Sequence, residues 1–195
     1  TIAAIPGDGI GTEVIAAGLA ALNVLAERDR GFKLNVEHFP WSSAYYKQHG
    51  YYIPPGGLAR LKTFDAIFFG AVGAPDVPDH VSLWGLRLPI CQGFDQYANV
   101  RPARVLPGVT SPLAGGERID WIIIRENSEG EYAGSGGRVH QGLPEELATE
   151  TSVFTRNGVA RIHRFAFELA QQRPRKHLTL VTKSNAQRHG MVLWD

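Results

Sequence analysis

The sequence predicts an α/β fold with a mostly parallel sheet and flanking helices. Short apolar segments alternate along the chain with segments whose apolar residues recur at helical spacing, which is the pattern of strand–helix–strand units. Residues 66–70 are apolar without interruption, as expected for a strand that is covered on both faces of a parallel sheet. Parallel strands need long connections, usually helices, so the two observations agree.

The first half of the chain supplies three of the predicted strands. Apolar side chains recur at helical spacing in residues 12–27, whereas those of residues 32–39 alternate as in a strand. Ser42 or Ser43 is suited to cap a helix, because a serine hydroxyl accepts a hydrogen bond from a free amide. In chain order we expect a strand at 2–5, a glycine turn at 6–11, a helix at 12–27, a strand at 32–39, helices at 42–49 and 58–62, and a strand at 66–70.

The second half contains the clearest strand, at residues 119–125. Thr155 is suited to cap a helix that ends before Pro174. In chain order we expect a helix at 83–94 with Pro89 near its start or at a kink, an extended segment at 99–109, the strand at 119–125, a polar glycine-rich stretch at 128–142, an exposed strand or arm at 147–154, the capped helix, and a last strand at 177–182. The best candidate for a domain boundary lies near residues 99–102.

Composition argues against several classes of partner. The 195 residues carry a formal net charge of +1, which gives no support for binding to nucleic acid or to a membrane surface. We find no apolar run of the roughly 18–20 residues that a membrane span needs, and no signal segment before the first strand. A single cysteine excludes an intrachain disulfide and a cysteine-based metal site. We therefore expect a cytoplasmic protein.

The glycine turn Gly7-Asp-Gly-Ile-Gly11 lies between a predicted strand and a predicted helix. Backbone amides and the helix dipole at such a place can bind an anion. The third glycine comes one residue too early for the dinucleotide pattern G-x-G-x-x-G, and the lysine of a phosphate-binding P-loop is missing. The alternative is a tight turn that requires small residues.

Two cations occupy equivalent places in the sequence. Arg125 and Lys183 each end a predicted apolar strand and are each followed by a polar residue and an asparagine. Ligands of open α/β sheets bind at the carboxyl ends of the strands. One charged residue at a strand end argues little, because strand ends reach solvent, but two with the same layout favour a binding site. Tyr132, in the predicted loop after Arg125, is either an acid beside that cation or a packing residue.

The segment at residues 87–101 contains Arg87 and Arg101 as well as Cys91. Because a guanidinium binds a carboxylate through two parallel hydrogen bonds, these arginines together with Arg125 predict a receptor for a small di- or tricarboxylate. Other chemistries lack support, since the seven histidines show no metal-ligand spacing and no G-x-S-x-G motif is present. Cys91 is best explained as a small buried hydrophobe.

Six ordered motifs resemble those of the β-decarboxylating dehydrogenases, which act on isopropylmalate, isocitrate, homoisocitrate, D-malate or tartrate. Residues 82–85 and 94–99 most resemble the tartrate/D-malate branch. The resemblance covers residues 1–195 through Gly7-Asp-Gly-Ile-Gly11, Phe69-Gly-Ala-Val-Gly73, Asp95-Gln-Tyr-Ala-Asn-Val-Arg-Pro102, Val105-Leu-Pro-Gly108, Arg125-Glu-Asn-Ser-Glu-Gly-Glu-Tyr132 and Thr182-Lys-Ser-Asn185.

This resemblance implies an isopropylmalate/isocitrate dehydrogenase-like fold and an oxidation of a 2-hydroxy dicarboxylate that depends on NAD and on Mg²⁺ or Mn²⁺. The oxidation would proceed with or without decarboxylation, and the loss of CO₂ would form an enolate. It implies that Arg101 and Arg125 bind the substrate carboxylate and that Tyr132 protonates the enolate. In a homodimer, Lys183 of the partner subunit would relay the proton of the 2-hydroxyl. The cofactor would be contacted by Ile10 and by Asn185 from the partner subunit.

Cys91 departs from the family pattern, which has an arginine at that position. Arg87 lies four residues earlier, on the same face of the predicted helix. It also occupies the place where the family positions a side chain against the variable group of the substrate. We expect Arg87 to replace the missing cation and to favour a small polar or acidic substrate such as tartrate or D-malate over 3-isopropylmalate.

The family also implies more sequence than these 195 residues provide. Its metal-binding aspartates would lie beyond Asp195, so we expect no metal site here and no activity of this chain alone. Residues 1–100 would be part of the large cofactor-side domain and 101–195 part of the small substrate and dimerisation domain. The alternative is a non-catalytic, regulatory carboxylate-binding subunit. A standard Rossmann dehydrogenase is disfavoured, because Glu37 is a weak candidate for its ribose-binding acid.

Overall fold

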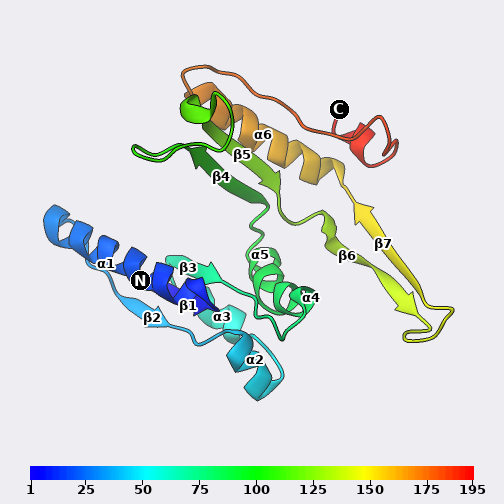
Figure 1. The fold of residues 1–195 in the computed structure, drawn as a ribbon, viewed down its shortest axis with the longest axis horizontal. Helices are drawn as coiled ribbons and strands as arrows, with labels where there is room; N and C mark the ends of the chain where they lie inside the picture. Colours follow the sequence, from blue (N-terminus) through cyan, green and yellow to red (C-terminus); the bar gives the residue numbers. More distant parts are fainter. The chain divides into compact units, whose positions relative to one another are not determined.

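The computed structural model describes residues 1–195, which divide into two compact units (Figure 1). Unit 1 comprises Thr1–Gly93 and unit 2 comprises Phe94–Asp195. A boundary at residues 100–101 would cut a strand of unit 2, so the structure places the division earlier in the chain.

Unit 1 is built on a parallel three-stranded sheet. Its strands β1 (Ile2–Gly7), β2 (Val36–His38) and β3 (Ala66–Ala71) have the order β2-β1-β3, and both pairings are parallel. Helix α1 (Ile10–Asp29) follows β1 directly and packs on the sheet. The core of this contact is formed by Ala4, Ile15, Leu19 and Phe68.

The other helices of unit 1 begin where the sequence provides a reason. Helix α2 (Ser43–His49) has Ser42 as its N-cap, and the Ser42 hydroxyl accepts a hydrogen bond from the Tyr45 amide at 3.1 Å. Helix α3 (Gly57–Leu61) is short. The predicted helix at 83–94 belongs to a longer helical run composed of α4 (Asp79–Ser82), the π-helical turn η1 (Leu83–Arg87) and α5 (Leu88–Gly93). Cys91 is buried there, as a small hydrophobe would be.

Unit 2 contains two antiparallel strand pairs and one long helix. Strands β4 (Ala98–Arg104) and β5 (Asp120–Glu126) form the first pair, and β6 (Gly130–Val139) and β7 (Leu147–Val153) form the second. Helix α6 (Arg156–Gln172) follows β7 and lies along β5 (Figure 1). Thr155 is its N-cap, and the Thr155 hydroxyl accepts a hydrogen bond from the Gly158 amide at 3.0 Å. Two short 3₁₀ turns, η2 (Gly116–Arg118) and η3 (Met191–Leu193), complete the unit.

Three local predictions need correction. The predicted strand at 177–182 is irregular and Val181 is 86% exposed, because no strand of this chain pairs with the segment. The glycine-rich stretch at 128–142 contains β6, whose backbone pairs with β7. Strand β3 is not covered on both faces: Ala66 is exposed and the residues after it are only half-buried, because too little of unit 1 packs over them.

Helix α1 also corrects the expectation that no segment is suited to span a membrane. By length and composition alone, Ile10–Asp29 passes the test for a membrane span. Core helices of soluble proteins and signal sequences near an N-terminus have the same length and apolar composition. Here Gly18 lies against the Phe68 ring of β3, so one face of α1 contacts protein.

Candidate active site

The antiparallel pairing of β4 and β5 brings two of the predicted substrate-binding arginines onto one face. Asn99 lies opposite Arg125, and Arg101 lies opposite Ile123. Because side chains alternate along a strand, those of Arg101 and Arg125 point to the same side of the strand pair. The two residues are diagonal neighbours, a relation that typically places their backbones about 7–8 Å apart. The Arg101 Nε donates a hydrogen bond to the Asn99 Oδ1 at 2.8 Å. The face therefore presents two guanidinium groups in unit 2.

The guanidinium of Arg125 contacts the predicted acid directly. Its Nη1 donates to the Tyr132 hydroxyl at 3.2 Å, and its Cζ lies 5.1 Å from the centre of the Tyr132 ring. Tyr132 lies within strand β6 and not in a loop as predicted, at the irregularity between Gly130 and Ser135 where the register with β7 shifts. A tyrosine hydroxyl that accepts from a guanidinium keeps its own proton to donate.

Asn127 is a member of this cluster that the sequence indicated only indirectly. Its Oδ1 accepts from Arg125 Nη2 at 2.9 Å, and its Nδ2 donates to the Gln96 carbonyl at 3.1 Å. The side chain is buried, with 2% of the residue exposed. The available signal was the shared layout of cation, polar residue and asparagine. Asn127 follows strand β5, and its side chain fixes the orientation of the Arg125 guanidinium.

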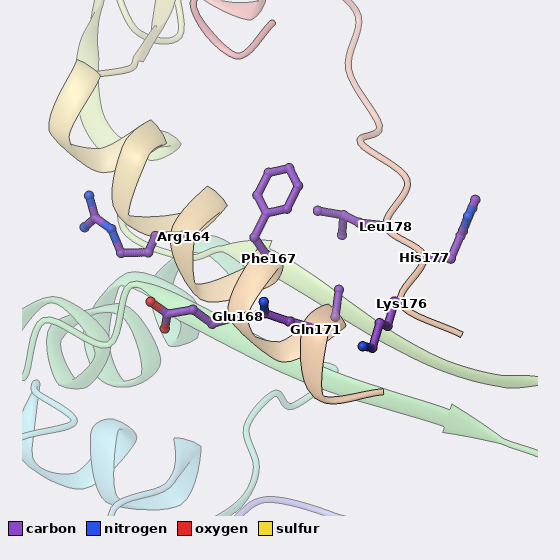
Figure 2. A pocket seen from close by; sticks show the side chains of 8 residues that line it. Arg164, Phe167, Glu168, Gln171, Lys176, His177 and Leu178 are labelled. Carbon is purple, nitrogen blue, oxygen red and sulfur yellow. The ribbon is translucent and has the colours of Figure 1, made fainter. Parts of the chain in front are cut away.

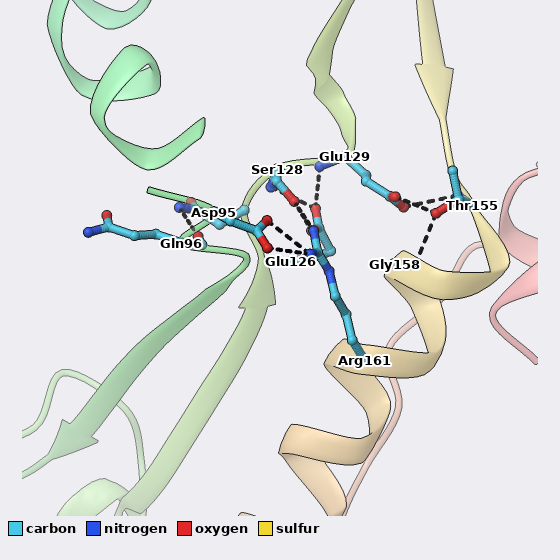
Figure 3. Close-up of polar contacts among 9 residues, drawn as sticks. Asp95, Gln96, Glu126, Ser128, Glu129, Thr155, Gly158 and Arg161 are labelled. Atoms are coloured by element: carbon cyan, nitrogen blue, oxygen red, sulfur yellow. Dashed lines mark hydrogen bonds and ion pairs between the residues drawn. The ribbon is translucent and has the colours of Figure 1, made fainter. Parts of the chain in front are cut away.

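The loop between β5 and β6 is held by two carboxylates (Figure 3). The buried Glu126 accepts from the Ser128 amide at 2.9 Å, from the Ser128 hydroxyl at 2.6 Å and from the Glu129 amide at 2.6 Å. The Glu129 carboxylate accepts from the amide and hydroxyl of Thr155 at 3.0 and 2.5 Å. The segment that separates Arg125 from Tyr132 is therefore tied to the start of α6.

The remaining predicted site residues lie outside this cluster. Arg87 is half-buried in η1 and Ile10 is 61% exposed at the start of α1, and both belong to unit 1. Lys183 and Asn185 belong to unit 2 and are exposed. Lys183 does not end a strand, contrary to the prediction, because the segment before it is unpaired. The amides of Ala186 and Gln187 donate to its carbonyl at 3.0 and 2.9 Å, so it begins a turn.

The glycine turn of unit 1 has strict steric requirements. A Cβ at Gly7, where φ is +74°, would lie 1.9 Å from the Ala71 carbonyl oxygen. Asp8 accepts hydrogen bonds from the Ser43 amide at 2.8 Å, the Ser43 hydroxyl at 2.7 Å and the Gly73 amide at 2.9 Å. The tight-turn interpretation of Gly7–Gly11 is therefore supported, and Asp8 links the turn to two other loops of the sheet.

Tyr52 completes the polar network around Asp8. Its hydroxyl hydrogen-bonds to the Ser43 hydroxyl at 2.9 Å, and only 2% of the residue is exposed. Burial raises the pKa of the Tyr52 phenol above its ordinary value, because the phenolate would lose its hydration. A phenol is already neutral at physiological pH, so burial shifts the ionisation of Tyr52 further into the alkaline range.

The residues present fit part of an NAD site but not a metal site. Gly9 caps α1 without a side-chain hydrogen bond, and the exposed Ile10 follows it. Helix-end amides of this kind suit one anionic edge of a nucleotide. In contrast, the described residues contain no group of three or more histidine, cysteine, aspartate or glutamate side chains that could hold a metal ion.

One surface groove is separate from the predicted residues (Figure 2). It has a volume of about 560 Å³ and lies between the C-terminal half of α6 and residues 176–178. Phe167 and Leu178 supply apolar surface, and Arg164, Lys176 and His177 supply basic groups. None of the predicted site residues lines it. The candidate site is accordingly defined by the Arg101–Arg125–Tyr132 arrangement and not by cavity size.

The sequence profile of the isocitrate/isopropylmalate dehydrogenase family matches residues 1–195. This chain belongs to that family. Its fold agrees, because a crystal structure of isocitrate dehydrogenase from Methylococcus capsulatus superposes with a TM-score of 0.81 at 29% sequence identity, over 99% of this chain and 54% of that one.

Two curated relatives have higher sequence identity to this chain than that solved structure has. A probable tartrate dehydrogenase/decarboxylase of Agrobacterium vitis is 69% identical over 196 residues, and the decarboxylating D-malate dehydrogenase of Escherichia coli is 54% identical over 198 residues. Each comparison covers 100% of this chain and 55% of the relative. The chain thus spans about half the length of these relatives. Both relatives are named as decarboxylating dehydrogenases.

Proposed function

We propose that this chain forms part of an enzyme that oxidises a small 2-hydroxy dicarboxylate, tartrate or D-malate, with NAD and Mg²⁺ or Mn²⁺, and then decarboxylates the product. The observation that carries the proposal is the pairing of Arg125 with Tyr132 on a sheet face that also presents Arg101. This arrangement supplies forks for carboxylates beside a proton donor. The names of the relatives support the same chemistry.

Each proposed step assigns a task to residues of this chain. Arg101 and Arg125 bind substrate carboxylates, which orients the 2-hydroxyl carbon for oxidation. Lys183, contributed by the partner subunit, takes the proton from the oxygen of the 2-hydroxyl. The hydride leaves the carbon that carries this hydroxyl. After CO₂ is lost, Tyr132 donates its proton to the carbon of the enolate. Bound NAD supplies the hydride acceptor, and Ile10 together with Asn185 of the partner subunit contacts it.

Metal ligands must come from outside these 195 residues in this proposal. The described residues provide no suitable cluster, so no step is assigned to a metal through them. The relatives are longer than this chain, which is consistent with ligands in the remaining sequence.

We also propose that the enzyme is a cytoplasmic homodimer without nucleic-acid or membrane partners. Val139, Leu147 and Val153 of the β6–β7 hairpin are exposed, and apolar side chains on a strand pair favour association with another chain. Dimerisation would also bring Lys183 and Asn185 to the neighbouring site.

Arg87 is proposed to determine the substrate. A guanidinium donates hydrogen bonds to an acidic or hydroxylated group of a substrate, whereas an isopropyl group offers no acceptor. We expect Arg87→Leu to lower kcat/KM for tartrate and D-malate at least tenfold and to raise it relatively for 3-isopropylmalate. Arg104→Leu, at the end of β4 on the face opposite to Arg101, removes the same charge and serves as a control. Unchanged kcat/KM values for tartrate and D-malate in Arg87→Leu would contradict this assignment.

A regulatory, carboxylate-binding subunit is the second candidate. The observation that favours it is Cys91, which is buried where the family pattern has an arginine. Such a subunit would bind dicarboxylates without turning them over.

One experiment separates the two candidates. Residues 1–195 are joined to the remaining sequence of the Agrobacterium vitis relative, and the chimera is assayed with NAD and Mn²⁺ on tartrate, D-malate, 3-isopropylmalate and isocitrate. We expect the highest kcat/KM for tartrate or D-malate, and a kcat lower by a factor of about 10²–10⁴ in the Tyr132→Phe chimera. Dicarboxylate binding by calorimetry without NAD reduction would instead favour the regulatory subunit.

A further inference from the structure

Arg161 on helix α6 lies at the centre of a polar network that none of the proposed catalytic steps uses (Figure 3). Its Nη1 donates to both carboxylate oxygens of Asp95, each at 2.9 Å. Its Nη2 donates to the Ser128 hydroxyl at 2.9 Å, and its Cζ lies 4.5 Å from the centre of the Tyr97 ring. One side chain thus connects α6 to the segment before β4 and to the loop after β5.

The Asp95 end of this network leads to Arg125. Asp95 has a φ of +48°, an uncommon conformation for a non-glycine residue that surrounding contacts must hold. The next two residues accept hydrogen bonds from Asn127, whose amide donates to the Tyr97 carbonyl at 2.8 Å and whose side chain donates to the Gln96 carbonyl. Asn127 in turn accepts from Arg125. Arg161 therefore supports the segment that orients the Arg125 guanidinium.

The Ser128 end leads to Tyr132. Ser128 accepts from Arg161 while its hydroxyl donates to Glu126, so its position is fixed from both sides. Glu129 is held against α6, because a Cβ at Gly158 would lie 2.1 Å from its carboxylate and Thr155 donates to it twice. The whole loop between Arg125 and Tyr132 is consequently anchored to the first turns of α6.

We propose that Arg161 is a positioning residue that keeps Arg125 and Tyr132 at hydrogen-bonding distance. The effect of Arg161 on catalysis rests on the proposed function. Its effect on the positions of Arg125 and Tyr132 rests only on the contacts described above. A planar guanidinium can contact Asp95 and Ser128 together and stack on Tyr97, whereas a lysine ammonium offers a single point of charge. Arg161→Lys should therefore retain the charge and lose the positioning.

The first test is a crystal structure of the Arg161→Met chimera. We expect the Arg125 Nη1 to Tyr132 hydroxyl separation to leave hydrogen-bonding range, and the loop at residues 126–129 to shift. Retention of the separation seen here would overturn the inference. Arg164→Met, on an exposed residue of the same helix, is the matched control and should keep the separation. This test gives its result even if the chimera shows no turnover, an outcome that would refute only the proposed function.

The second test is kinetic and uses the variants Arg161→Met, Arg161→Lys and Tyr132→Phe, alone and combined. We expect Arg161→Met to lower kcat for tartrate or D-malate by about tenfold to a hundredfold, as small misplacements of reacting groups do. In the Tyr132→Phe background the same change should have no further effect on kcat, because it acts through Tyr132. Full additivity of the two effects would overturn the inference, and thermal unfolding of each variant shows that it is folded.

Discussion

At the scale of single residues, the hydrogen bond between Arg125 and Tyr132 decides which proton is available for chemistry. A guanidinium has only donors, so the phenol oxygen must accept and its own hydrogen points elsewhere. The same cation lies near the ring face, which adds an electrostatic attraction between them. Under the proposed function, the pair would supply a pre-oriented acid beside a carboxylate receptor.

Tyr132→Phe removes this acid and changes little else. General acid catalysis contributes a factor of about 10²–10⁴, so we expect kcat of the chimera to fall by that factor while KM changes only a few-fold. Steady-state kinetics with D-malate measure both constants. A large rise in KM with kcat unchanged would instead assign Tyr132 to substrate binding.

Tyr52→Phe tests the buried network of unit 1. Loss of its hydrogen bond to Ser43 should lower the free energy of unfolding by about 1 kcal/mol near pH 7. Because burial raises the pKa of Tyr52, its contribution is complete below the unfolded phenol pKa of about 10 and is lost as pH rises through the folded value. The wild-type chain should thus lose more stability than the variant above pH 10.

Urea unfolding of both proteins at pH 7 and above pH 10 measures this difference. If the free energy of unfolding fell equally in both proteins above pH 10, the ionisation of Tyr52 would not be coupled to unfolding. The network would then be held by Asp8 alone.

At the scale of secondary-structure elements, α1 has one face that must stay small. A Cβ at Gly18 would lie 2.5 Å from the Phe68 Cζ, and Phe68 packs in the core between α1 and the sheet. Gly18→Leu should therefore destabilise the chain by about 1–3 kcal/mol through overpacking. Ala17→Leu, on the neighbouring exposed position, should stay within about 0.5 kcal/mol.

Urea unfolding of the two variants makes the comparison. Equal stability would mean that α1 does not pack on β3 as the structure has it, and the apolar length of α1 would then require another explanation.

Elements that depend on neighbouring residues were predicted well from the sequence. Ser42 and Thr155 cap α2 and α6 as expected, because an N-cap bonds to amides only three residues away. The strand that carries Arg125 was also found, since its apolar run is long. These features place Arg125 at the end of a strand, without knowledge of the strand that pairs with it.

Elements that depend on distant partners were not predictable in this way. Strand β6 contains Gly134, Gly136 and Gly137, which weaken the strand signal, and it forms because β7 pairs with it. Residues 177–182 have the strand signal but no strand partner in this chain. The cluster around Arg161 was missed for the same reason, because it joins residues 95, 128 and 161, which are remote in sequence.

At the scale of the whole molecule, the two units each carry only a part of the proposed site. Unit 1 contains Ile10 and Arg87, whereas unit 2 contains Arg101, Arg125 and Tyr132. The proposed function requires both units, Lys183 of a second subunit, and metal ligands from sequence beyond these 195 residues. Activity should therefore appear only when this assembly is complete.

The 195-residue chain alone is thus expected to bind Mn²⁺ only weakly, with Kd above about 1 mM, and to reduce no NAD. A divalent cation needs several oxygen ligands at one place, and the described residues provide no cluster of three acidic, histidine or cysteine side chains. The chimera adds the relative's remaining sequence and should bind Mn²⁺ at least tenfold more tightly. Electron paramagnetic resonance of free Mn²⁺ measures both affinities, and tight binding by the 195-residue chain would show that its own residues assemble a metal site.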